Sequence, residues 1–183
     1  QKKRYMLSAQ LSYDITDWLN IAGRVRIDNS HTKYEQKLYA SSNATITEES
    51  TQGHYTIAKP DETQTYAHVL ANINNRFGDY SLVANVGASI VNNKFEELSY
   101  RGPIREKGIP NVFNVFDLDN AKKKARQDEW QEQTQSIFAS VEVGWKSMLY
   151  LTLTGRNDWA SQLANSSTSS FFYPSVGLSG VIS

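Results

Sequence analysis

Alternating apolar and polar residues divide most of the chain into stretches that predict long β-strands. The clearest stretch places Leu149, Leu151 and Leu153 on one face. Thr152 and Thr154 lie on the other, because successive side chains of a strand point to opposite sides. About seven stretches alternate in this way, and by residue number they are 7–14, 19–28, 68–74, 81–90, 136–145, 149–156 and 175–182. The pattern predicts an all-β chain whose strands each have one apolar and one polar face.

The lengths of these stretches and of their connections favour a membrane-spanning wall. Strands of soluble sheets commonly run about 5 to 6 residues, whereas a tilted strand needs roughly 9 to 11 residues to cross a bilayer. Short connections at 15–18, 78–79 and 146–148 alternate with long ones at about 40–64, 102–134 and 158–170. Outer-membrane barrels place short turns in the periplasm and long loops outside. We therefore expect an antiparallel transmembrane β-barrel segment with three long external loops.

The number of strands implies that this wall is incomplete. In an antiparallel meander, the first and seventh strands run in the same direction, so they cannot pair to close an antiparallel ring. An open sheet in lipid leaves unpaired backbone groups that each cost several kcal/mol. We expect the chain to form a fragment, residues 1–183, of a single larger barrel domain. Closure by several copies of the chain is the alternative, and it needs parallel pairing at every seam.

Composition narrows the class of protein only partly. The chain has 21% charged residues and a mean hydropathy of −0.53, values that also suit a soluble protein. It contains no cysteine and no apolar run long enough for a transmembrane helix. Its formal net charge is zero, so nothing indicates nucleic-acid binding. A soluble β-sandwich or glycan-binding β-domain stays open as an alternative on composition.

Two motifs near the C-terminal end resemble a known family. The first is Gly155-Arg156-Asn157-Asp158-Trp159, and the second is the segment 170–179, which contains Phe172-Tyr173-Pro174-Ser175. Together with the upstream segment 108–114, they resemble the barrel of SusC/RagA-type TonB-dependent outer-membrane transporters. Gly180 and the loop after Trp159 depart from the usual pattern of that family.

The resemblance implies the remaining architecture and the partners. It implies a barrel of the 22-stranded type, filled by a plug domain that we do not expect within these residues. It also implies a SusD-like surface lipoprotein as lid, the TonB complex as energy source, and an oligosaccharide or peptide as ligand. The location would be the outer membrane of a Gram-negative bacterium, in contact with lipid. An outer-membrane barrel hydrolase remains an alternative of a different class.

Candidate site residues fall into three groups. We expect a structural role for the family-motif residues, in which Arg156 and Asp158 share a strand face and Pro174 marks a strand start or a bulge. Arg24, Arg26 and Arg156 are candidates to face the lumen, where contact with the plug is the simpler use. Tyr39, Tyr55 and Trp130 are candidates for ligand or partner contact from the loops. A polar stretch from Asp119 to about Gln133 predicts a surface helix within one loop.

Nothing in the sequence points to catalysis or to a cofactor. His31, His54 and His68 lack the spacing of a metal site. The segment beginning at Asp117 lacks the glycine and terminal glutamate of a calcium loop. No G-x-S-x-G motif is present. We therefore expect no catalytic residues, no metal ligands and no cofactor.

Overall fold

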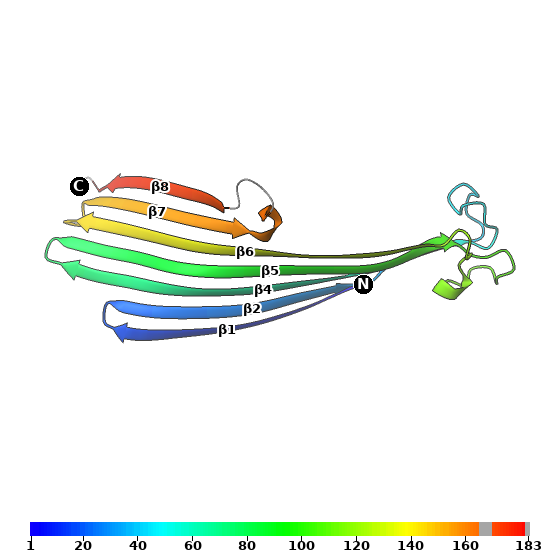
Figure 1. The fold of residues 1–183 in the computed structure, drawn as a ribbon, viewed down its shortest axis with the longest axis horizontal. Coiled ribbons are helices and arrows are strands. Elements are labelled where there is room, and N and C mark those ends of the chain that lie inside the picture. Colours follow the sequence, from blue (N-terminus) through cyan, green and yellow to red (C-terminus); the bar gives the residue numbers. More distant parts are fainter. Residues whose placement is uncertain (165–169, 182–183) are drawn as a thin grey trace. The chain divides into compact units, whose positions relative to one another are not determined.

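The strands form one sheet in the order β1-β2-β4-β5-β6-β7-β8, with β3 paired to β4 (Figure 1). The computed structural model describes residues 1–164 and 170–181. The strand bounds are β1 Lys2–Thr16, β2 Leu19–Thr32, β3 Tyr34–Leu38, β4 His54–Phe77, β5 Tyr80–Pro103, β6 Lys124–Trp145, β7 Leu149–Ala160 and β8 Ser170–Gly180. Two short 3₁₀ helices, η1 Val115–Asp117 and η2 Ser161–Leu163, lie in connections. Neither is long and apolar enough to cross a membrane.

The all-β antiparallel fold predicted from the sequence is confirmed, with one more strand than the alternation indicates. The extra strand is β3, which follows β2 after a break at Lys33 and pairs antiparallel with the start of β4 from Tyr34↔Ala58 to Leu38↔His54. The backbone N–H of Lys33 donates to the carbonyl of Gln1, the residue before β1, at 2.7 Å. β3 therefore continues β2 alongside β4 after the break at Lys33, and it does not add a further strand to the width of the sheet.

Several strands extend well beyond the predicted ends. Residues 54–64 belong to β4, residues 102–103 to β5 and residues 124–134 to β6, so the connections are 39–53 and 104–123. The helix predicted from Asp119 to about Gln133 is wrong, because Asp119 heads only a turn and β6 begins at Lys124. Tertiary pairing overrides the helix propensity of this polar stretch. The third loop, predicted at 158–170, begins later in the structure, because residues 158–160 belong to β7 and residue 170 begins β8. It contains η2, and its residues 165–169 lie outside the described part of the chain.

Contacts between Cα atoms divide the chain into two compact units. We call one the loop unit, which comprises Gln1–Tyr5, Asn29–Thr63 and Lys94–Trp130. The other is the wall unit, which comprises Met6–Asp28, Gln64–Asn93 and Gln131–Ser183.

Among the described residues, one face of the wall unit is apolar and exposed. Across β6, β7 and β8 the register joins Val141 to Leu153 and Leu153 to Val176, so these apolar side chains form one row. Leu153 is 46% exposed and Val176 is 75% exposed. A large apolar surface of this kind marks contact with a partner or a membrane, and here it continues the alternation expected of a barrel wall.

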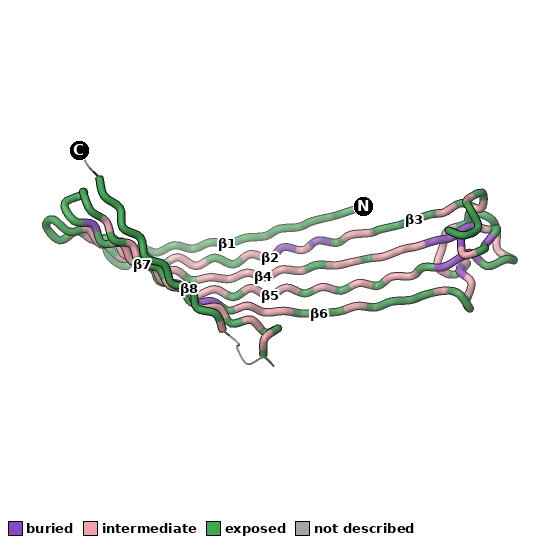
Figure 2. Tube along the Cα trace, turned by 90° about the horizontal axis from the view of Figure 1, so that it is seen from above, coloured by how far each residue is buried: buried purple, intermediate pink, exposed green. Residues whose placement is uncertain are grey.

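The loop unit has a small core where its two connections meet (Figure 2). Ile104 and Leu118 are each 1% exposed and form an isolated antiparallel bridge. The backbone N–H of Ile104 donates to the carbonyl of Gly53 at 2.8 Å, and the hydroxyl of Ser50 donates to the carbonyl of Ile104 at 2.8 Å. The connection 39–53 is thus fastened to the connection 104–123 by main-chain hydrogen bonds around an apolar pair.

Candidate functional site

The two family motifs lie opposite each other on β7 and β8. The antiparallel register pairs Gly155 with Pro174, Arg156 with Tyr173 and Asn157 with Phe172. Next to them, the hydroxyl oxygens of Thr154 and Ser175 lie 2.6 Å apart. Although the motifs are separated in sequence by a loop, they form one structural element in the sheet.

Arg156 anchors this element on the polar face of the wall unit. Its Nε donates to Oδ1 of Asp158 at 2.7 Å, and its Nη2 donates to Oγ of Ser136 on β6 at 3.1 Å. Ser136 is 3% exposed, so the guanidinium supplies a hydrogen bond to a buried hydroxyl. The pairing of Arg156 with Asp158 predicted from strand alternation is present. The hydrogen bond from Arg156 to Ser136 ties β7 to β6.

The remaining motif residues have apolar or backbone roles. Trp159 lies on the opposite face from Arg156, where its cross-strand partner is Gln135. A Cβ at Gly155 would lie 3.3 Å from the ring of Phe172, so that ring covers the glycine. The sequence predicts a strand start or a bulge at Pro174, whereas the structure continues the register through it.

A row of polar side chains crosses four strands of the wall unit, and we call it the polar row. Nη2 of Arg26 donates to Oε1 of Gln64 at 3.0 Å, and Nε2 of Gln64 donates to Oδ1 of Asn93 at 2.9 Å. Nδ2 of Asn93 then donates to Oε1 of Glu132 at 2.9 Å. Gln162 of η2 donates to the other oxygen of Glu132. Amide groups relay the interaction between the Arg26 cation and the Glu132 carboxylate.

Arg24 lies on the same face of β2 as Arg26 and contacts a different strand. Its Nε donates to Oε1 of Gln10 on β1 at 3.0 Å. The guanidinium carbon of Arg26 also lies 5.7 Å from the ring centre of Tyr66, within the range of a cation–π interaction. All three arginines that the sequence selects therefore lie on the polar face, and each has a hydrogen-bond partner within the wall unit.

Sequence reasoning missed most members of the polar row. Gln64 was assigned to a loop and Glu132 to the predicted helix, so neither was placed on a strand face. Asn93 follows directly from the polar side of the strand around residues 81–90. The available signal was the continued alternation of residues beyond the apolar part of each strand.

The three loop aromatics differ in their accessibility. Tyr39 is 54% exposed and Trp130 is 48% exposed, whereas Tyr55 is only 3% exposed. The hydroxyl of Tyr55 donates to Oε1 of Glu35 at 2.6 Å, and its ring lies 6.0 Å from that of Phe113. Burial and this carboxylate raise the pKa of Tyr55 to about 12. Tyr55 is a packing residue in this structure and presents no free ring to a ligand.

Trp130 and Tyr39 each have an aromatic neighbour that orients the ring. Trp130 stacks on Phe95 with a centroid distance of 5.5 Å and an interplanar angle of 15°. Tyr39 meets Phe113 edge to face at 5.3 Å. Ordered, partly exposed rings of this kind offer flat apolar surfaces to a ligand. No group of three His, Asp or Glu residues with metal-binding geometry occurs in the described part of the chain.

Comparison with known proteins gives a family match over almost the whole chain. Residues 1–179 match the model of the TonB dependent receptor-like β-barrel. No curated protein matches the sequence.

Solved structures with the same fold include transporters and receptors. The RagAB peptide transporter superposes with a TM-score of 0.70 at 15% identity, covering 97% of this chain and 20% of that chain. The RagAB peptide importer in its open-open state gives a TM-score of 0.71 at 15% identity, with the same coverage. The ferric preacinetobactin receptor BauA from Acinetobacter baumannii gives 0.61 at 17% identity, covering 97% of this chain and 28% of that one.

These likenesses show the fold, and the chain spans about a fifth of the length of the first relatives. The family match removes the soluble β-sandwich and the soluble glycan-binding domain as alternatives, and it disfavours the barrel hydrolase. The apolar outer face, the paired motifs and the match over residues 1–179 together identify the chain as a member of the TonB-dependent receptor β-barrel family, a segment of barrel wall in the outer membrane of a Gram-negative bacterium.

Proposed function

We propose that this segment belongs to a transporter that imports oligosaccharides or peptides through the outer membrane together with a SusD-like surface lipoprotein. The observation that carries the proposal is the superposition of 97% of the chain on the RagAB peptide transporter with a TM-score of 0.70. The superposition on the siderophore receptor PiuA from Acinetobacter baumannii is weaker, with a TM-score of 0.57. The motif pair on β7 and β8 supports the same choice, because it resembles SusC/RagA-type barrels.

The polar face of the wall unit suits the lumen of such a transporter. Arg24, Arg26 and Arg156 are held there by neutral or acidic partners, so their donors are pre-oriented. In this role they contact the plug domain that the family implies, and TonB acts through parts outside residues 1–183. The amides of the polar row add neutral donors and acceptors, which suit a wet surface along which solutes or plug segments move.

Tyr39 and Trp130, the exposed aromatics of the loop unit whose rings are oriented by an aromatic neighbour, are the proposed contacts for ligand or lid. Trp130 and Tyr39 present ring faces or edges that stack on sugar rings or on peptide side chains. The buried Tyr55 packs against Phe113, and Phe113 in turn contacts and orients Tyr39.

Uptake by whole cells tests the function directly. Cells that produce the full-length protein are given a mixture of oligosaccharides and peptides, and loss of each from the medium is followed by mass spectrometry. We expect one of the two classes to be depleted only when the protein and an active TonB complex are both present. TonB-independent depletion, or depletion of ferric siderophores alone, would overturn the proposal.

Variants connect that uptake to the loop unit. Trp130→Ala should slow uptake several-fold at low ligand concentration, because it removes a stacking surface. Phe116→Ala provides a matched control, since Phe116 is another loop aromatic and is 93% exposed without a ring partner among the described contacts. Both proteins should reach the membrane in equal amounts. Equal uptake by the two variants would remove Trp130 from the proposed contact surface.

A further inference from the structure

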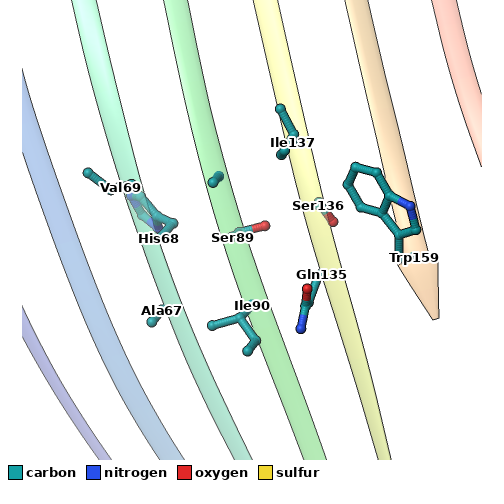
Figure 3. Close-up of a pocket in the computed structure, with 10 residues that line it drawn as sticks. Ala67, His68, Val69, Ser89, Ile90, Gln135, Ser136, Ile137 and Trp159 are labelled. Carbon is teal, nitrogen blue, oxygen red and sulfur yellow. The ribbon is translucent and has the colours of Figure 1, made fainter. Parts of the chain in front are cut away.

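The apolar face of the wall unit carries a groove of about 600 Å³ (Figure 3). Strand alternation places Val69, Ala88, Ile90, Ile137 and Trp159 on this face, and they come from β4, β5, β6 and β7. Ser136 also borders the groove, yet its hydroxyl is bonded to Arg156 on the polar face. The groove is therefore a depression in the surface that faces away from the polar row.

Small residues create the depression and larger ones form its sides. Ala67 and Ala88 leave space on β4 and β5, where neighbouring positions carry longer side chains. Val69 is 50% exposed and Ile137 is 54% exposed. The indole of Trp159 borders the groove on β7 (Figure 3). Contact of such a surface with a chain of methylene groups is more favourable than its contact with water, because burial of apolar area lowers the free energy.

The groove lies at the outer limit of the apolar face. Trp159 is the register partner of Gln135, and the next residues on that face of β6 toward the loop end are Gln133 and Gln131. Nε2 of Gln131 donates to Oδ1 of Asn92 on β5 at 2.9 Å. The side-chain amides of these residues thus follow directly after the apolar residues that line the groove. Tryptophan at such a boundary is typical of the membrane–water interface.

We propose that this groove holds one acyl chain of a lipid in the outer leaflet, with the lipid headgroup beside the amides of Gln135, Gln131 and Asn92. The face is continuous with the lipid-contacting surface of the family's barrel, so lipid is the occupant already adjacent to it. The polar headgroup then lies beside the amides, and the apolar acyl chain lies against Val69, Ile90 and Ile137. The inference rests on the family assignment and is independent of the imported substrate.

Photochemical labelling tests the inference on the full-length protein in phosphatidylethanolamine nanodiscs. A small fraction of the lipid carries a diazirine within an acyl chain, and labelled peptides are quantified by mass spectrometry. Val25 is the matched reference, because it is 49% exposed on the same face and lies outside the groove. We expect labelling of the peptides with Ala88 and Ile137 to exceed that of the Val25 peptide several-fold.

Filling the groove gives the second arm of the test. Ala88→Leu should reduce labelling of the Ile137 peptide to the level at Val25 and leave labelling at Val25 unchanged. Ala67→Leu serves the same purpose if Ala88→Leu does not assemble, as judged by heat-dependent mobility. Equal labelling of the groove and Val25 in the unmodified protein would overturn the inference. Cross-links from the groove to a second copy of the barrel would overturn it as well.

Discussion

The ring of Phe138 on β6 occupies the space where a side chain of Gly87 on β5 would lie. A Cβ at Gly87 would come within 2.6 Å of Cζ of Phe138 and 2.9 Å of the carbonyl oxygen of Val69. Gly87 is therefore required by the close approach of three strands, and Phe138 shields the backbone that the glycine leaves open. The pair lies on the polar face of the wall unit, where Asn85 and Ser140 are bonded nearby at 3.2 Å.

Gly87→Ala should destabilise the barrel by about 1 to 3 kcal/mol, the usual cost of overpacking. Gly23→Ala is the control, because a Cβ there would lie 3.8 Å from its nearest neighbour, the carbonyl oxygen of His68. Urea-induced unfolding of the full-length protein in lipid vesicles measures both effects. Equal unfolding midpoints for the two variants would show that Phe138 moves aside without cost.

Asn93→Asp should weaken the polar row, because the isosteric carboxylate replaces the donor to Glu132 by a like charge. We expect a loss of roughly 1 to 3 kcal/mol, which is the range for an unsatisfied buried hydrogen-bonding group. Asn92→Asp is the control, since in the described part of the chain Asn92 accepts a hydrogen bond from Gln131 and Asp keeps that acceptor. The same unfolding assay applies. A larger effect at Asn92 than at Asn93 would contradict the role of the polar row.

Gly53→Ala should loosen the loop unit. Gly53 has a φ of +111°, and a Cβ there would lie 2.6 Å from the carbonyl oxygen of Leu38. Gly78→Ala is the control, because Gly78 also has a positive φ of +59° but has open space around it. The control therefore shows the conformational cost alone, about 1 to 2 kcal/mol. Limited proteolysis should cut the connections 39–53 and 104–123 faster in Gly53→Ala, and equal cleavage in both variants would argue against the clash.

Acidification should open the connection 39–53 through His54. Burial lowers the pKa of His54, while Glu48, with an oxygen 3.6 Å from Nε2, opposes the shift, and Arg101 and Lys124 reinforce it. A depressed pKa means that the folded state favours the neutral ring. The stability from this ring is fully present above the unfolded value of about 6.5, and it is lost as the pH falls from there through the folded pKa.

Hydrogen exchange of residues 44–54 measures this opening, once corrected for the intrinsic effect of pH on exchange. Wild-type protein should lose protection below about pH 6.5. His54→Gln, which carries no titrating ring, should show protection that is independent of pH over the same range. Loss of protection that is identical in both proteins would assign the effect to other groups.

The wall unit was predictable because the bilayer imposes a pattern on the sequence. Leu151 and Leu153 face lipid and Thr152 faces the wet side, so the alternation alone gives the strand and its faces. The pairing of Arg156 with Asp158 follows from the same rule. The register between the motifs on β7 and β8 does not follow from either motif alone, since Gly155 and Pro174 carry no side chains that specify it.

The loop unit was predicted poorly because the strand segments within it lack a continuous alternation of apolar and polar residues. The stretch from Lys124 to Gln133 has no apolar face, so its polar composition was the only basis for a prediction, and that composition favours a helix. The burial of Tyr55 depends on Glu35 and Phe113, which come from two other segments of the chain. Contacts of that kind depend on how the connections fold together, which no local pattern encodes.

The order β1-β2-β4-β5-β6-β7-β8 leaves β1 and β8 each with one unpaired edge among the described residues. Because these two edge strands run in the same direction, an odd number of further strands must join them to complete an antiparallel ring. The free energy of unfolding is then a property of the closed ring. Any substitution between β1 and β8 is therefore measured as a change in the stability and cooperativity of the whole closed ring, and not of these strands alone.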